Sequence, residues 1–245
     1  MSAQDFLDSH GLPRDAYKVE ESRLTEYRGR VPDDLIDLWR EVGFGAYIDR
    51  KYWFCEPSMF DPYFSEILSY FEDLHHSNFA AFGYSCLGVV DLWHKSHRHY
   101  TFDLSTGLLL DLTSLRETAE PPYNVEELMA LVGVPEEQAR ETFLASRSRP
   151  QDIWVSLESA VDAEGYRMIF TDSGKQLIRE LRSAYGNLQS GEVYIRRNDF
   201  ANEPESYERI ALKNAFTVRP SNVRYIRYSK VDGRQQPIEE IFSVR

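Results

Sequence analysis

The chain has 245 residues, of which 42% are hydrophobic, 28% are charged and 13% are aromatic. This composition is that of a folded protein with a substantial core, and it excludes disordered, collagen-like and coiled-coil chains. The formal net charge of −12 argues against a dedicated binder of nucleic acid or of an anionic membrane. Residues 1–120 carry 21 acidic and 11 basic side chains, a net charge of −10, so the first half has either a plainly soluble surface or a basic partner.

The N-terminal sequence predicts a protein that stays in the cytoplasm. Residues 1–15 contain neither the basic nor the apolar stretch of a secretory signal, and no later segment approaches 18 consecutive apolar residues. The two cysteines, Cys55 and Cys86, each lie in an apolar run, so we expect reduced thiols in the core.

Residues 31–57 are the most strongly patterned segment, and they follow a polar stretch in which we expect two short helices. Pro32 occupies a position where a helix tolerates proline, and two aspartates follow it at the positive end of the helix dipole. Four apolar residues recur at helical spacing: Leu35, Leu38, Trp39 and Val42. Gly43 ends the predicted helix, and the aromatic run after it predicts one buried strand.

This segment resembles the signature of the GAD-like domain, LPxxLxxxWRxxGFxxYxDxxYWxxxP. The matching residues are Val31, Pro32, Leu35, Trp39, Arg40, Gly43, Phe44, Tyr47, Asp49, Tyr52, Trp53 and Pro57. Val31 stands where the pattern usually has leucine, which changes no chemistry. GAD-like domains occur in immunity proteins encoded beside DNase toxins of bacterial type VI secretion systems. The resemblance implies a protein that binds such a toxin and is not an enzyme, with no cofactor and no metal.

Residues 61–112 predict a second helix and then a set of strands. Asp61 and Pro62 begin the helix, whose apolar stripe consists of Phe64, Ile67, Leu68, Phe71 and Leu74. Residues 79–94 and 100–112 predict strands broken by turns, the clearest of them at residues 105–107. We expect an α+β fold in which antiparallel sheets carry the helices on one face.

The second half of the chain predicts another module. Helices are expected after residues 124 and 134, and the polar segment 146–152 is the best linker, which divides the chain into a GAD-like domain at 1–148 and an α+β domain at 149–245. Strands are expected at 153–157 and 166–170.

Residues 162–194 resemble the small Tdi-type C-terminal domain that accompanies GAD-like domains in these immunity proteins. Residues 171–173 predict the start of a helix with Leu177, Ile178 and Leu181 facing inward, followed by a strand at 193–195. Residues 223–230 and the turn at Asp232 and Gly233 predict a final hairpin, which has no place in the family pattern.

Three histidines close to an aspartate form the main chemical motif of the sequence. Asp91, His94, His97 and His99 could hold a divalent metal, which leaves a metal-dependent enzyme as an alternative function. The same residues also suit a polar hairpin tip, and the neighbouring Lys95 would repel a cation.

A toxin-binding surface is predicted around the second helix and the first hairpin. A basic nuclease would be attracted by carboxylates and held by a few aromatic side chains. The candidates are Asp61, Tyr63, Glu66, Tyr70, Glu72, Asp73, Asp91, Trp93 and Asp103. An interaction module without any immunity role is the remaining alternative.

Overall fold

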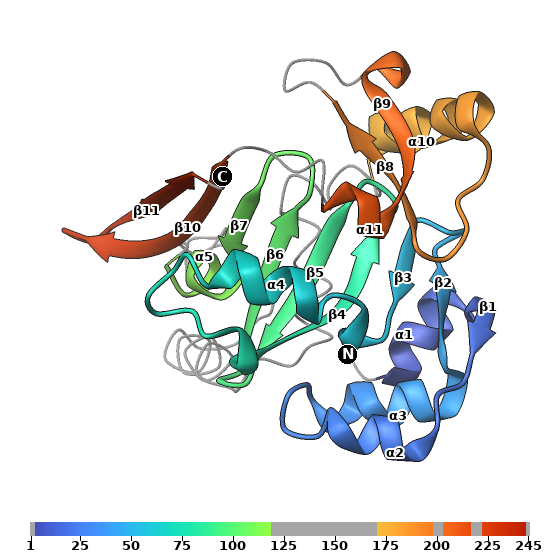
Figure 1. The fold of residues 1–245 in the computed structure, drawn as a ribbon, viewed down its shortest axis with the longest axis horizontal. Coiled ribbons are helices and arrows are strands. Elements are labelled where there is room, and N and C mark those ends of the chain that lie inside the picture. Colours follow the sequence, from blue (N-terminus) through green and yellow to red (C-terminus); the bar gives the residue numbers. More distant parts are fainter. Residues whose placement is uncertain (1–2, 119–170, 198–202, 217–221, 244–245) are drawn as a thin grey trace, which may run out of the picture.

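The computed structural model describes residues 3–118, 171–197, 203–216 and 222–243 (Figure 1). The described strands form a nine-stranded sheet in the order β1-β2-β3-β4-β5-β6-β7-β10-β11 and a two-stranded sheet, β8-β9. Every neighbouring pair is antiparallel except β7 and β10, which run parallel. The predicted α+β class, dominated by antiparallel pairing, is confirmed.

The elements have the following bounds. The first part contains α1 (Ala3–His10), β1 (Arg14–Tyr17), α2 (Glu21–Glu26), α3 (Asp33–Val42), β2 (Phe44–Tyr47), β3 (Tyr52–Phe54) and η1 (Pro57–Met59). The middle part contains α4 (Asp61–Leu68), η2 (His76–Asn78), β4 (Phe79–Ser85), β5 (Val89–His94), β6 (Arg98–Asp103), β7 (Leu108–Asp111) and α5 (Leu112–Thr118). The last part contains α10 (Asp172–Tyr185), β8 (Glu192–Arg196), η4 (Pro204–Ser206), β9 (Tyr207–Ala211), α11 (Leu212–Ala215), β10 (Asn222–Val231) and β11 (Arg234–Ser243).

The helix predicted after Pro32 is confirmed, and it buries Leu35, Leu38 and Trp39. Gly43 ends it with φ +81° and ψ −175°, a backbone conformation that is essentially restricted to glycine. A Cβ atom at this position would also lie 2.4 Å from the backbone oxygen of Tyr17. The turn therefore depends on glycine for two reasons, conformation and space.

The single strand predicted after Gly43 is wrong, because the structure has two strands there, β2 and β3. They pair antiparallel and bury all their residues. Residues 48–51 between them reverse the chain, and Ile48, Asp49 and Arg50 have φ values of 50°, 52° and 57°. Aromatic content indicated burial correctly, but it did not reveal the reversal.

The second predicted helix begins at Asp61 as expected, but it ends at Leu68 instead of continuing to Leu74. Phe71 and Leu74 are nevertheless buried. Phe71 lies against Tyr225 of β10 and Phe242 of β11, with ring centroids 5.3 and 4.8 Å apart. Helical spacing thus identified the buried residues, while contacts with the distant hairpin fix the path of residues 69–74.

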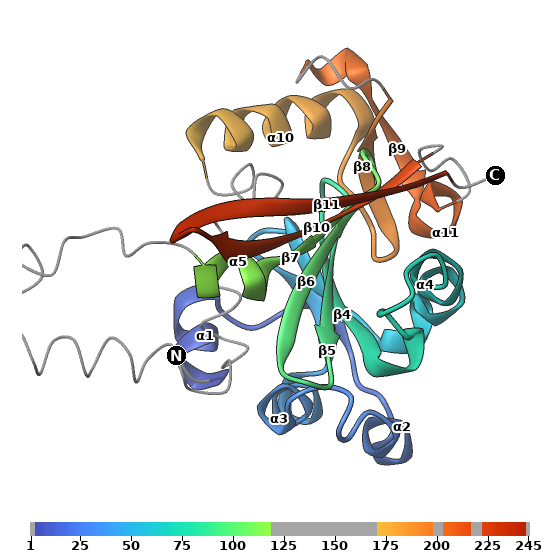
Figure 2. The ribbon, with the colours of Figure 1, turned by 90° about the vertical axis from the view of Figure 1, so that its left-hand side faces the viewer.

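The prediction that the helices lie on one face of the sheet is wrong, because they lie on both faces and at one end of the large sheet (Figures 1 and 2). In both views α4 lies across one face of β4–β7, and α5 lies on the opposite face (Figures 1 and 2). Helices α1–α3 gather at the β1–β3 end (Figure 1). Each helix in the described ranges is too short or too polar to cross a lipid bilayer.

The elements predicted in the second half are confirmed where the structure describes them. Thr171 caps α10 by accepting a hydrogen bond from the Gly174 backbone at 3.1 Å, and the three predicted apolar residues of this helix are buried. Asp232 and Gly233 form the turn of the β10–β11 hairpin, both with positive φ. The sequence did not predict that β10 joins the first-half sheet, where Arg224 pairs with Leu108 of β7.

Several predictions concern residues outside the described ranges: the helices after 124 and 134, the linker 146–152 and the strands at 153–157 and 166–170. The boundary at residue 148 is among them. The division into two domains stays a prediction.

Arg182 of α10 binds the turn between β2 and β3. Its guanidinium donates to the Asp49 carboxylate at 2.6 Å and also to the Asp49 backbone oxygen. This hydrogen bond lowers the pKa of Asp49 below its ordinary value of 3.8, and the charge of Arg14 acts in the same direction. The contact joins the second half of the chain to the most strained turn of the first half.

Substitution of Gly43 by alanine is expected to destabilise the protein by about 2–3 kcal/mol, because both the backbone conformation and the nearby Tyr17 oxygen oppose a side chain. Gly29→Ala is the control, since Gly29 has φ +74° but an added Cβ atom there would meet nothing within 4 Å. It should cost about 1 kcal/mol. Urea unfolding measures both, and equal losses would contradict the close contact at Gly43.

Asp49→Asn is expected to lower stability by about 0.5 kcal/mol near neutral pH, a small value because the Asp49 side chain is half exposed. A carboxylate with a lowered pKa stabilises the fold above its ordinary pKa, and this contribution disappears as the pH falls through the lowered value. The two proteins should therefore converge in acid. Urea unfolding across pH checks this, with Glu41→Gln at an exposed position as control. A difference in unfolding free energy between the wild-type protein and Asp49→Asn that persists in acid would argue against the ion pair.

Candidate functional site

An acidic surface of the structure is formed by α4 and the segment after it. Between Lys51 and Lys95 the chain contains no lysine or arginine. Helix α4 buries Phe64, Ile67 and Leu68 against the sheet, so its opposite side faces solvent. We call the four carboxylates of this region, Asp61, Glu66, Glu72 and Asp73, the α4 acidic face.

The members of the α4 acidic face differ in how they are neutralised. Asp61 is half buried and accepts a hydrogen bond from Arg30 at 3.1 Å. Arg30 also donates to the Phe79 backbone oxygen at 3.1 Å, which fixes its position. Glu66, Glu72 and Asp73 are exposed, and the last two form no ion pair with the described part of the chain. The face therefore presents the carboxylates of Glu72 and Asp73 to solvent, while Asp61 is neutralised by Arg30.

Some acidic residues of α2 and α3 form ion pairs with nearby arginines. Arg40 binds both Glu21, at 2.8 Å, and Asp37. Arg23 binds Glu56 and lies 3.6 Å from Glu26. Asp33, Asp34 and Glu41 of α3 are exposed and form no ion pair with the described part of the chain, so α3 also presents carboxylates to solvent.

The two predicted tyrosine anchors of this region, Tyr63 and Tyr70, are half buried. The Tyr63 ring stacks on Phe216, with centroids 4.3 Å apart and planes tilted by 7°. Phe216 directly follows α11, so this stack joins α4 to the second half of the chain. One face of the Tyr63 ring is therefore used within the fold.

Three of the nine predicted contact residues do not lie near α4. Successive residues of a strand point to opposite faces of the sheet. Phe102 of β6 faces α4, because its ring lies against Phe64 with centroids 5.6 Å apart. Asp103, the next residue, therefore points away from α4, and so do Asp91 and Trp93, which pair with Thr101 and His99. The predicted set divides between the two faces of the sheet.

Asp91 and Trp93 were predicted as toxin contacts, but both are buried and unavailable to a partner. The Tyr52 hydroxyl donates to Asp91 Oδ2 at 2.9 Å, and His99 Nε2 lies 2.7 Å from Asp91 Oδ1. These partners satisfy a carboxylate that water does not reach. The sequence did contain a signal, since Asp91 stands between valines and a leucine in an apolar strand.

Asp103 is half buried and helps to form the turn between β6 and β7. Its carboxylate accepts a hydrogen bond from the Ser105 backbone at 2.8 Å. Burial raises the pKa of Asp103, and the hydrogen bonds within the turn act against this. Its role is local, in turn formation.

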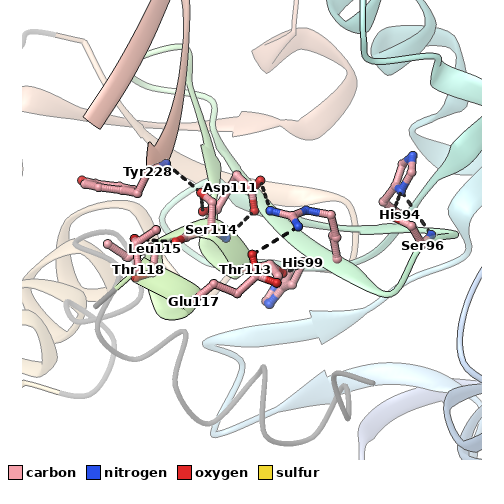
Figure 3. Close-up of polar contacts among 11 residues, drawn as sticks. His94, Ser96, His99, Asp111, Thr113, Ser114, Leu115, Glu117, Thr118 and Tyr228 are labelled. Atoms are coloured by element: carbon pink, nitrogen blue, oxygen red, sulfur yellow. Dashed lines mark hydrogen bonds and ion pairs between the residues drawn. The ribbon is translucent and has the colours of Figure 1, made fainter. Parts of the chain in front are cut away.

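The three histidines considered as metal ligands are separated by the strands that carry them. His99 is buried beside Asp91, whereas His94, which pairs with Arg98 across the hairpin, lies on the opposite face (Figure 3). The His94 ring contacts the Ser96 hydroxyl at 2.6 Å, and His97 is exposed in the turn with φ +61°. The described residues contain no group of three or more ligand-type side chains arranged around one point.

A polar network joins the C-terminal hairpin to the sheet (Figure 3). Buried Asp111 accepts from Arg98 at 2.7 Å and from the Ser114 backbone at 2.9 Å. The Ser114 hydroxyl accepts from the Tyr228 backbone of β10 at 2.8 Å. Gln235 of β11 donates to the Leu115 oxygen at 2.9 Å. The network holds β10 and β11 in place, so we assign it a structural role.

Asp91→Ala is expected to destabilise the protein by about 3 kcal/mol, because it leaves the buried Tyr52 hydroxyl and His99 ring without their acceptor. Asp73→Ala is the matched control and should change stability by less than about 0.5 kcal/mol, since that carboxylate is exposed. Thermal and urea unfolding measure both. A mild effect at Asp91 would mean that water or another group replaces the lost carboxylate.

Both the sequence and the fold of this chain can be compared with those of known proteins. The chain is similar to the protein in the crystal structure of Atu4351 from Agrobacterium tumefaciens, with a TM-score of 0.62 and 15% sequence identity over 95% of each chain. At this identity the likeness shows a shared fold. No curated protein matches the sequence. Residues 2–105, which include the α4 acidic face, match the family model of the GAD-like domain. This stretch of the chain is therefore similar to the GAD-like domain.

Proposed function

We propose that this protein is an immunity protein that binds a basic toxin, a type VI secretion DNase, by direct contact and so neutralises it. The observation that carries this proposal is the α4 acidic face, in which Glu72 and Asp73 are exposed and form no ion pair with the described residues. A nuclease must present lysine and arginine to phosphates, so its active surface is complementary in charge to this face. The expected role is binding, without turnover of a substrate.

The GAD-like domain match supports the proposal in a general way, since it is consistent with a protein-interaction module. The net charge of −10 over residues 1–120 supports it further, because such a field raises the association rate of a cationic protein. Affinity would come mainly from a few desolvated side chains near the charges, and Tyr70 is the best placed.

The proposal is tested by co-expressing the protein with the product of the adjacent gene, purifying the complex, and measuring growth of cells that make the toxin. Co-purification together with restored growth is the expected result. Binding of a basic protein without any protection would favour an interaction module with another role. Absence of both a complex and protection would end the proposal.

The double substitution Glu72→Lys and Asp73→Lys is expected to slow association with the toxin by about tenfold or more at low salt, because it reverses the charge of the exposed part of the face. The effect should shrink as salt rises. Glu203→Lys with Glu205→Lys is the control, since it changes the net charge equally at η4. Surface plasmon resonance measures the rates, and equal slowing by both variants would point to net charge rather than to this face.

A further inference from the structure

Strand β11 forms one edge of the nine-stranded sheet, and among the described strands it pairs only with β10. Figure 2 shows this long strand running along the side of the molecule. Edge strands carry backbone N–H and C=O groups that can pair with another chain. The direction of those groups along β11 follows from the contacts of β10.

The backbone N–H groups of Arg224 and Tyr228 point away from β11, because the first donates to Gly107 at 3.0 Å and the second to Ser114 at 2.8 Å. Their register partners on β11 are Ile241 and Pro237. In an antiparallel pair, residues opposite each other either both face the partner strand or both face away. The backbone groups of Pro237, Glu239 and Ile241 therefore point to the outer side of the sheet.

Pro237 divides this edge into two parts. Proline has no N–H, so an added strand finds no donor at that position. Glu239 and Ile241 do have an outward N–H and C=O, and they leave the segment after Pro237 able to pair. Ile241 is 61% exposed and Ile238 is 38% exposed, which is unusual for large apolar side chains.

The charges around this segment are mixed, and the carboxylates that lack an ion pair with the described residues lie on the face that carries α4. Glu239 is paired with Arg224 at 2.6 Å, and Arg227 lies opposite Ile238. Glu240 shares a face with Phe242, which contacts Phe71, the residue directly before Glu72 and Asp73 of the α4 acidic face. A cationic strand is thus attracted to the edge. A second copy of this chain, which carries a charge of −12, is repelled from it.

We propose that residues 238–243 of β11 receive an extended, lysine- or arginine-rich segment of a partner protein as an added strand of the sheet. The inference rests on the proposed function for the basic character of that partner. Backbone hydrogen bonds to Glu239 and Ile241 supply the pairing, and the side chain of Ile241 supplies an apolar contact.

The test uses the full chain and a fluorescent peptide of alternating lysine and valine, with binding followed by fluorescence anisotropy. Ile241→Pro should weaken binding about tenfold, because it removes one outward donor and obstructs the edge. Its fold should persist, since the N–H of residue 241 does not serve β10 and Pro237 already occupies an equivalent position. Urea unfolding verifies this. Pro237→Val should strengthen binding several-fold by restoring a donor.

Two controls examine the nature of the occupant. A peptide of alternating glutamate and valine should bind at least about tenfold more weakly than the lysine peptide. Sedimentation equilibrium of the chain alone should show no self-association that depends on residue 241. Such self-association, or peptide binding that neither Ile241→Pro nor Pro237→Val changes, would overturn the inference.

The outcome is separable from that of the proposed function. If the toxin co-purifies and protects cells while peptide binding ignores residues 237 and 241, the edge inference alone is wrong. If the peptide binds at the edge as expected but no toxin is captured, the inference stands and the proposed function is wrong.

Discussion

The parallel pairing of β10 with β7 is the interaction on which the arrangement of this protein depends. It extends the sheet of the first half of the chain by the β10–β11 hairpin. Without it, Phe71 would lose its two aromatic neighbours, and residues 69–74 would lose the contacts that hold them beside the sheet. The position of Glu72 and Asp73, and the exposure of β11 as an edge, both follow from this pairing.

The polar contacts divide into those that maintain the fold and those left for a partner. Asp91 and Asp111 are buried carboxylates that accept hydrogen bonds from protein donors. Such groups stabilise one arrangement of the strands, because loss of a donor would leave a buried carboxylate without its partner and lower the stability of the fold. Asp49 lies at the surface, but it joins two segments 133 residues apart in the chain. Glu72 and Asp73 make no comparable ion pair in the described chain, so their replacement would affect binding more than folding.

Local sequence signals predicted the parts of the fold that local contacts determine. Helix α3 was predicted from Pro32 to Gly43 because its start, apolar stripe and end are all encoded within this one short segment. The end of α4 and the docking of β10 were missed, because they depend on partners such as Tyr225 and Ser114 that lie far away in the chain. In the candidate site, acidity selected Asp91 along with Asp73, although the apolar neighbours of Asp91 in β5 were a local signal that it is buried. The pairing of β5 with β6 then shows that Asp91, Trp93 and Asp103 point to the face opposite α4.

The α4 acidic face and the β11 edge would contribute to binding through different physical terms. Charges at the surface act over roughly a Debye length of 8–10 Å and mainly raise the rate of encounter, so their contribution falls as salt rises. Backbone pairing at an edge acts at hydrogen-bond distance and mainly slows dissociation. Because Phe242 and Phe71 place the two surfaces side by side, a basic segment drawn to Glu72 and Asp73 arrives next to the outward backbone groups of Glu239 and Ile241. Pro237 limits the length of strand that can add there, which reduces indiscriminate pairing at this edge and leaves a short stretch for a partner that the charges have already selected.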